Sequence, residues 1–193
     1  MKVTAVKTKV LAIPNNEPYY YSQGVGRGVN CVLVEVETDE GITGIGEACG
    51  DRSAEAIVGI VHAAARAIEG ESPFDIEKFL YRFYRIGKWD DMRRFANQAL
   101  AGVEMALWDI VGKACNQPVH RLLGGKFSDR VSCFAFLQGN DPEKLAADAR
   151  KWREMGFHVM YVKVGLGNDR DLACVEAVRR AAGDEAKVRI DAN

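Results

Sequence analysis

The sequence predicts an α+β domain followed by an α/β segment whose strands run parallel to one another. Hydrophobic and polar residues alternate in the first fifty residues, as in strands with one buried face. From residue 52 to about residue 116, apolar residues recur three and four positions apart, as they do on helices. After Arg130 strand and helix patterns alternate, and the 28 residues from Lys163 to Asp191 match the length of one βα unit.

The composition is that of an ordinary globular chain. Of the 193 residues 48% are hydrophobic and 27% are charged, and the formal net charge is −1. With 26 basic and 27 acidic residues the chain lacks the strong positive electrostatic field that would attract nucleic acid. There is no apolar run of the ~20 residues that a membrane span needs, and the amino terminus lacks a signal-peptide pattern. We therefore expect a cytoplasmic protein without nucleic-acid or membrane partners.

The five cysteines and three histidines indicate neither a disulfide framework nor a zinc site. The cysteine number is odd, no Cys-x-x-Cys pair occurs, and no histidines pair at a metal-ligand spacing. Buried thiols are the simplest interpretation of the cysteines.

The amino-terminal strands are expected to form a meander. The expected strands cover residues 3–13, 30–38 and 41–49, with a tight turn at Thr38–Gly41. Residues 14–30 are expected to form a long loop that contains Tyr19, Tyr20 and Tyr21, and loops of this length are usually functional or disordered. The glycines at positions 24, 26 and 28 have the wrong spacing for a nucleotide loop, and a strand rather than a helix follows them.

Three helices are expected next, and the strand and helix patterns then alternate to the end of the sequence. The expected helices cover residues 52–70, 74–87 and 93–115, and Pro118 ends the last of them. The later expected elements are strand 130–137, helix 141–156 with Asp141 as N-cap, strand 158–165, helix 168–183 and strand 187–193.

A βαβαβ pattern fits either a doubly wound sheet or the opening of a (β/α)₈ barrel. A dinucleotide fold needs Gly-x-Gly-x-x-Gly after its first strand. The nearest match, Gly165 and Gly167, follows the second strand and has Arg170 at the last glycine position. The barrel is therefore favoured, and a barrel presents side chains from the carboxyl ends of its strands at one face.

Four polar residues lie near the ends of two expected strands. Tyr161 and Lys163 share one side of their strand, and Asp191 and Asn193 share one side of the next. A lysine whose pKa is lowered by a nearby metal cation becomes a base, and Asp191 offers the hard oxygen that Mg²⁺ prefers. Alternatives remain open: Lys163 can extend to a barrel rim, Asp191 can cap a later helix, and Tyr161 can simply pack.

The stretch from residue 99 to residue 125 strongly resembles the mandelate racemase and muconate lactonizing enzyme family of the enolase superfamily. Residues 37–48, 156–165 and 189–193 also resemble it, so the resemblance covers essentially the whole chain. The matching positions are Ala99, Gly102, Glu104, Ala106, Leu107, Asp109, Gly112, Lys113, Pro118, Leu122, Leu123 and Gly124. The resemblance implies an enolase-like capping domain over residues 1–125. It also implies the first three βα units of a (β/α)₈ TIM-type barrel over residues 126–193, incomplete after the third strand.

The family resemblance also implies roles for the polar residues. Lys163 stands at the second lysine of the family's Lys-x-Lys motif, the base that removes a proton alpha to a carboxylate. Asp191 corresponds to the first of three acidic ligands of Mg²⁺, with Mn²⁺ as a second option, and Asn193 to a substrate contact. Tyr161 replaces the first lysine, where a phenol can donate a hydrogen bond or relay a proton.

Substrate contacts from the amino-terminal domain are implied as well. The family's capping loops correspond here to the region of Tyr19 and Tyr21 and to the region of Asp51. Tyrosines in such a loop offer apolar and hydrogen-bonding surface to a carboxylate ligand. A solvent-facing loop explains the same residues equally well.

The resemblance implies an enzyme that acts on a small-molecule carboxylate substrate through an enediolate that Mg²⁺ stabilises, as in enolase-type sites generally. We favour a muconate cycloisomerase-like reaction, with a racemase, an epimerase or a sugar-acid dehydratase as alternatives. The chain holds three of eight barrel strands, so we expect it to be the amino-terminal half of a longer homo-oligomeric enzyme, inactive if it ends at residue 193. A non-catalytic fragment that serves as an association module is the alternative from a different class.

Overall fold

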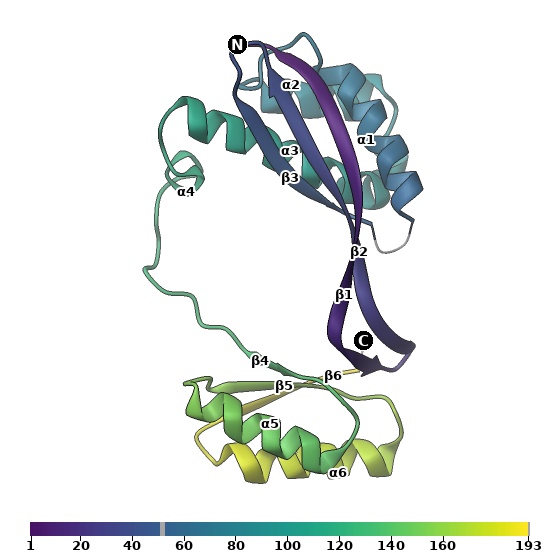
Figure 1. The fold of residues 1–193 in the computed structure, drawn as a ribbon, viewed down its shortest axis with the longest axis vertical. Coiled ribbons are helices and arrows are strands. Elements are labelled where there is room, and N and C mark those ends of the chain that lie inside the picture. The colour runs from purple at the N-terminus through teal and green to yellow at the C-terminus, as the bar shows by residue number, and fades with distance from the viewer. Residues whose placement is uncertain (51–52, 193) are drawn as a thin grey trace. The chain divides into compact units, whose positions relative to one another are not determined.

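A computed structural model describes residues 1–50 and 53–192, so Asp51 and Asn193 lie outside the described residues. The chain divides into two compact units (Figure 1). The first unit comprises Met1–Ile13 and Val29–Phe127, and the second comprises Pro14–Gly28 and Ser128–Asn193. A stretch near the amino terminus thus groups with the carboxyl-terminal third of the chain.

The first sheet has the order β1, β2, β3. Strand β1 spans Val3–Tyr21, β2 spans Gly24–Thr38 and β3 spans Thr43–Cys49. Strands β2 and β3 are antiparallel, with Cys31 opposite Cys49 and Glu37 opposite Thr43. The expected tight turn between them is confirmed: Gly41 has φ +79° and its N–H donates to the carbonyl of Thr38.

The loop expected over residues 14–30 was wrong, because this segment is the outer part of the β1–β2 hairpin. Strand β1 continues to Tyr21 and β2 begins at Gly24. Pro14 suggests a loop, but β1 is an edge strand, where a missing N–H is tolerated. Gly26 leaves room for a neighbouring ring, since a Cβ at this position would lie 2.0 Å from Cε1 of Tyr19.

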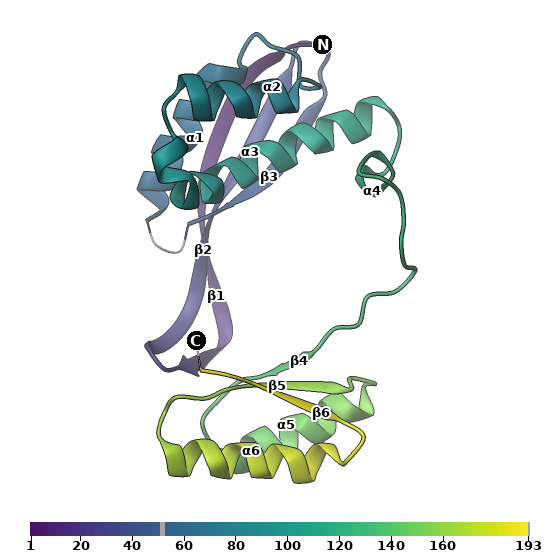
Figure 2. The same ribbon diagram turned by 180° about the vertical axis from the view of Figure 1, so that it is seen from behind.

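Helices cover one face of this sheet within the first unit (Figures 1 and 2). Helix α1 spans Ala54–Ile68, and Ser53 caps it by accepting from the N–H of Ala56. The remaining helices are α2 (Ile76–Tyr81), a π-helical turn (Arg82–Ile86), a short 3₁₀ turn (Asp90–Met92), α3 (Arg93–Ala114) and α4 (Val119–Leu122). The single helix predicted over residues 74–87 is therefore an α-helix that widens into a π-helical turn. None of the described helices is both long and apolar enough to cross a membrane.

Helix α3 approaches β3 at glycine positions. A Cβ at Gly44 would lie 2.0 Å from the carbonyl oxygen of Ala106, and one at Gly46 would lie 1.9 Å from that of Gly102. Val34 and Ala48 pack against Gly102 from the sheet side. Because any side chain would push the helix away, the glycines set the distance between the helix and the sheet.

Two side chains of α3 form hydrogen bonds with backbone groups on the outer edge of β3. The carboxylate of Asp109 accepts a 2.9 Å hydrogen bond from the N–H of Ile45. The ammonium of Lys113 donates to the carbonyl of Thr43 and to Asp109, at 2.7 Å each. Side chains thus bond to backbone groups at the sheet edge.

The second unit holds the strand and helix alternation that the sequence predicts. Strands β4 (Ala135–Leu137), β5 (Val159–Lys163) and β6 (Lys187–Asp191) form a parallel sheet in this order. Strand β4 is shorter than predicted, because its ladder with β5 runs from Ala135 to Leu137 and residues 131–134 are exposed.

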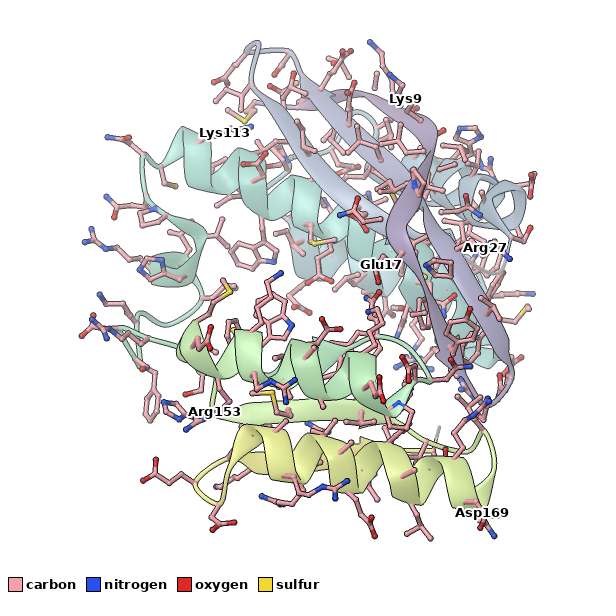
Figure 3. The ribbon with its side chains drawn as sticks, turned by 60° about the horizontal axis from the view of Figure 1, so that its bottom comes forward. Lys9, Glu17, Arg27, Lys113, Arg153 and Asp169 are labelled. Carbon is pink, nitrogen blue, oxygen red and sulfur yellow. The ribbon has the colours of Figure 1, made fainter. Side chains whose placement is uncertain are left out.

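Two helices cover one face of the parallel sheet. Helix α5 spans Pro142–Glu154 and α6 spans Asn168–Ala182. Asp141 caps α5 by accepting from the N–H of Glu143, as predicted. Figure 3 shows the two helices side by side, with Arg153 on the last turn of α5 and Asp169 on the first turn of α6.

Candidate active site

The candidate site lies on the face of the parallel sheet that α5 and α6 leave uncovered. Met160 and Val162 of β5 are buried in the core beneath the helices. Tyr161 and Lys163 alternate with them and therefore point to the opposite face. Lys163 stands directly opposite Asp191 in the β5–β6 register, so two strands deliver their polar side chains to one place.

Three of the predicted site residues meet at a single oxygen atom. The ammonium nitrogen of Lys163 lies 2.7 Å from Oδ2 of Asp191. The hydroxyl of Tyr161 donates a hydrogen bond to the same Oδ2. The Lys163 side chain is 16% exposed and that of Asp191 is 32% exposed, so the pair is partly shielded from water.

The protein groups at this oxygen raise two pKa values. The hydrogen bond to Asp191 is the main reason that the pKa of Lys163 is raised above its usual value. The hydrogen bond to Asp191 also raises the pKa of Tyr161. The lowered Lys163 pKa expected from the sequence depended on a nearby metal cation, and the protein groups alone have the opposite effect. A cation at Asp191 would compete with Lys163 for the carboxylate.

Aromatic rings surround Tyr161. Phe134 stacks on it with ring centroids 4.8 Å apart, and Phe136 meets it edge to face at 5.2 Å. The guanidinium of Arg189 lies 5.5 Å from the centroid of the Tyr161 ring. The sequence interpretation missed these three residues, although period-two alternation along β4 and β6 could have placed them on the same face.

The outer end of the β1–β2 hairpin, which belongs to the second unit, packs next to the Tyr161 cluster. Tyr19 meets Phe136 edge to face at 6.1 Å and stacks on Tyr21 at 5.4 Å. The hydroxyl of Ser22 donates to the carbonyl of Ala192, directly after β6. The structure thus places Tyr19 beside the predicted site with Tyr21 stacked on it, while the remaining two predicted substrate contacts, Asp51 and Asn193, lie outside the described residues.

An ion pair joins the same hairpin to α5. Glu17, on the β1 arm of the hairpin (Figure 3), lies 3.0 Å from the ammonium of Lys144. Lys144 also donates to the carbonyl of Gln138, just after β4, and to Asp148. The hairpin end is therefore held at the carboxyl-terminal ends of β4 and β6.

Asp191 fits the first requirement of a magnesium site. Its carboxylate provides the kind of hard oxygen that Mg²⁺ prefers, at the carboxyl end of a strand, where barrel folds place their functional residues. Across residues 1–50 and 53–192, no three His, Cys, Asp or Glu side chains gather in a way that could hold a metal. Asp191 therefore fits as one ligand of such a cation.

Comparison with known proteins identifies the family. Residues 4–124 match the family model for the amino-terminal domain of mandelate racemase / muconate lactonizing enzyme. The chain belongs to the mandelate racemase / muconate lactonizing enzyme family. The family resemblance predicted from the sequence is confirmed, and the α+β capping domain followed by the start of a barrel is confirmed with it.

Relatives in this family catalyse different reactions. The chain is 31% identical to N-succinyl-L-Arg/Lys racemase of Bacillus cereus and 33% identical to D-galactarolactone cycloisomerase of Agrobacterium fabrum. Both alignments cover the whole chain and 52% of the relative. A crystal structure of dipeptide epimerase from Enterococcus faecalis with Mg and L-Leu-L-Tyr superposes with a TM-score of 0.86 at 29% identity, covering 100% of this chain and 54% of that one. The chain thus spans about half the length of these relatives.

Proposed function

We propose that the protein is a Mg²⁺-dependent enzyme that removes the proton alpha to the carboxylate of a small-molecule substrate, with Mn²⁺ as a possible replacement. The observation that carries this proposal is the meeting of Lys163, Tyr161 and Asp191 at the carboxyl ends of β5 and β6. Relatives that are named racemase, epimerase and cycloisomerase support the same class of chemistry.

In this proposal Lys163 is the base and Asp191 is one ligand of the metal. When bound, Mg²⁺ would offset the negative charge that develops on the substrate carboxylate as the proton leaves. Asp191 would hold the cation, and its hydrogen bond with Lys163 would then be weaker, which would favour the neutral amine that accepts a proton at Nζ.

Tyr161 has a positioning role in the same scheme. Its hydroxyl donates to Oδ2 of Asp191 and so fixes the orientation of the carboxylate. A lysine at this position, as in Lys-x-Lys, would add a second cation beside the base. With tyrosine, orientation is kept and that charge is absent.

Among the reactions that begin with this step, we propose racemisation or epimerisation first. The support is that N-succinyl-L-Arg/Lys racemase and hydrophobic dipeptide epimerase both align over the whole chain at 31% identity. Cycloisomerisation is the second candidate, because the D-galactarolactone cycloisomerase is 33% identical. The narrower muconate cycloisomerase assignment stays a prediction, as do the homo-oligomer and the domain boundary between residues 125 and 126.

The test is α-proton exchange measured by NMR in D₂O with each enantiomer of a carboxylate substrate separately, using the complete protein and Mg²⁺. If Lys163 serves one face of the substrate, Lys163→Ala abolishes exchange from one enantiomer and leaves exchange from the other. Undiminished exchange from both enantiomers in a folded variant would remove Lys163 from the role of base.

The non-catalytic alternative has its own test. A titration calorimetry experiment on the 193-residue chain measures whether it binds Mg²⁺ and a carboxylate without further sequence. We expect weak binding, because a single carboxylate holds Mg²⁺ poorly. Tight binding would mean that the metal site needs no ligand beyond this chain.

A further inference from the structure

Three aromatic rings form a continuous surface beside the proposed base. They come from three separate elements: Tyr19 from β1, Phe136 from β4 and Tyr161 from β5. Phe136 lies between the other two, 6.1 Å from the Tyr19 ring and 5.2 Å from the Tyr161 ring, measured between centroids. All three side chains are partly exposed, so they are within reach of a ligand. We call this set of three residues the aromatic wall.

The aromatic wall is held in place by its surroundings. The Tyr19 ring lies over Gly26, where a Cβ would collide with it, and stacks on Tyr21. The hydroxyl of Tyr161 is anchored on Asp191, and Phe134 covers one face of its ring. Rings fixed in this way lose little conformational entropy when a ligand packs against them.

The charges around the wall select the kind of group that packs there. The ammonium of Lys163 lies 5.9 Å from the Tyr161 ring centroid, and the guanidinium of Arg189 lies 5.5 Å from it. Arg189 keeps its charge even when Lys163 is the neutral base, and this cation next to the ring disfavours a positive charge on the substrate. Aromatic ring carbons cannot satisfy several hydroxyl groups, so a polyhydroxylated chain would lose hydrogen bonds to water there.

From this arrangement we infer that the aromatic wall binds an uncharged apolar or aromatic substituent on the α-carbon of the carboxylate substrate. This inference rests on the proposed function, since it places the carboxylate at Lys163 and Asp191. It names the substrate class: a carboxylate with an apolar side group rather than a sugar acid. An apolar contact of this size discriminates between substrates by roughly 10-fold or more.

The experiment compares two carboxylate probes, 2-phenylpropanoate and D-gluconate. Titration calorimetry with the complete protein and Mg²⁺ measures the Kd of each probe for the wild type, Tyr19→Ala, Phe136→Ala and Phe136→Leu. Tyr20→Ala is the matched control, because alternation along β1 puts Tyr20 on the opposite face from Tyr19. Phe136→Leu keeps an apolar side chain, which provides a result if the alanine variant fails to fold.

We expect 2-phenylpropanoate to bind the wild type about 10-fold more tightly than D-gluconate. Tyr19→Ala and Phe136→Ala should remove most of that preference, Phe136→Leu should remove part of it, and Tyr20→Ala should preserve it. Tighter binding of D-gluconate, equal losses for both probes, or no binding of 2-phenylpropanoate would overturn the inference.

The inference and the proposed function fail in different ways. If 2-phenylpropanoate binds with the expected preference but no carboxylate exchanges its α-proton, the aromatic wall stands and the proposed chemistry falls. If D-gluconate exchanges its α-proton and also binds more tightly, the chemistry stands and the wall is overturned.

Discussion

Lys163 and Asp191 face each other in register across the parallel strands β5 and β6, and their side chains meet at 2.7 Å. They are 28 positions apart in the sequence, and helix α6 and most of β6 lie between them. Because parallel strands present their carboxyl ends at the same edge, a base and a metal ligand one βα unit apart become neighbours. The hydroxyl of Tyr161 then joins both at Oδ2 of Asp191.

Tyr161→Phe tests the role of this third residue. The variant keeps the ring and its packing against Phe134 and Phe136 but loses the hydrogen bond to Asp191. We expect the Kd for Mg²⁺ in the complete protein to rise about 10-fold, as for other partners of metal ligands. Titration calorimetry measures the Kd, and the melting temperature shows whether the fold is intact. An unchanged Kd would mean that Tyr161 does not orient the carboxylate.

Gly102→Ala and Gly59→Ala are predicted to have opposite effects on stability. A Cβ at Gly102 would lie 2.8 Å from Cγ2 of Val34, so we expect overpacking to lower the free energy of unfolding by about 1–3 kcal/mol. A Cβ at Gly59, inside α1, meets nothing within 4 Å. Alanine at this position should therefore raise the free energy of unfolding by about 0.5–1 kcal/mol. Urea denaturation of both variants checks the signs, and equal effects would contradict the packing explanation.

Asp109→Ala and Asp109→Asn separate two contributions at the edge of β3. Alanine removes the acceptor for the N–H of Ile45 and the partner of Lys113, and we expect a loss of about 1–2 kcal/mol. Asparagine keeps an oxygen acceptor for Ile45 but loses the ion pair, so its loss should be smaller. Denaturant titration of both variants distinguishes these cases, and equal losses for the two variants would assign the stabilisation to the ion pair with Lys113 rather than to the hydrogen bond from Ile45.

The carboxyl group of Glu71 makes the stability of the fold depend on pH. A hydrogen bond from Arg82 has the largest effect on its pKa, and together with one from Lys78 it lowers that pKa from 4.5 to about 2. Because the folded pKa is depressed, the stabilisation is complete above pH 4.5 and is lost as the pH falls towards 2.

Thermal unfolding at a series of pH values tests this, with Glu71→Gln as the comparison. The difference in melting temperature between the wild type and the variant should shrink as the pH falls through this window. A constant difference would show that the charge of Glu71 does not contribute.

The positions of the key polar residues were predictable because they follow from strand periodicity. Alternation along β5 puts Tyr161 and Lys163 on one face, and the length of a βα unit brings Asp191 beside them. The helix cap at Asp141 was predictable because it depends on neighbouring residues alone: the side chain accepts from the N–H of Glu143, two residues away.

The outer hairpin was not predictable, because its stabilising contacts are distant in sequence. Pro14 and the glycines of residues 24–28 indicate a loop locally, whereas Tyr19 meets the ring of Phe136 far along the chain. The same holds for the hydrogen bond from Ser22 to Ala192, which joins residues 170 positions apart. The choice between a helix and a π-helical turn at residues 82–86 has no clear signal in the sequence.

The hairpin end at residues 14–28 has a consequence for how the chain can diversify. It contacts β4, α5 and the end of β6, yet it is encoded far from Lys163 and Asp191. Substitutions in this short segment reshape the surroundings of the proposed base and leave the base and the metal ligand unchanged. Under the proposed function, Tyr19 can therefore change without altering Lys163, Tyr161 or Asp191, so substrate preference can shift through this segment while the residues of the reaction stay the same.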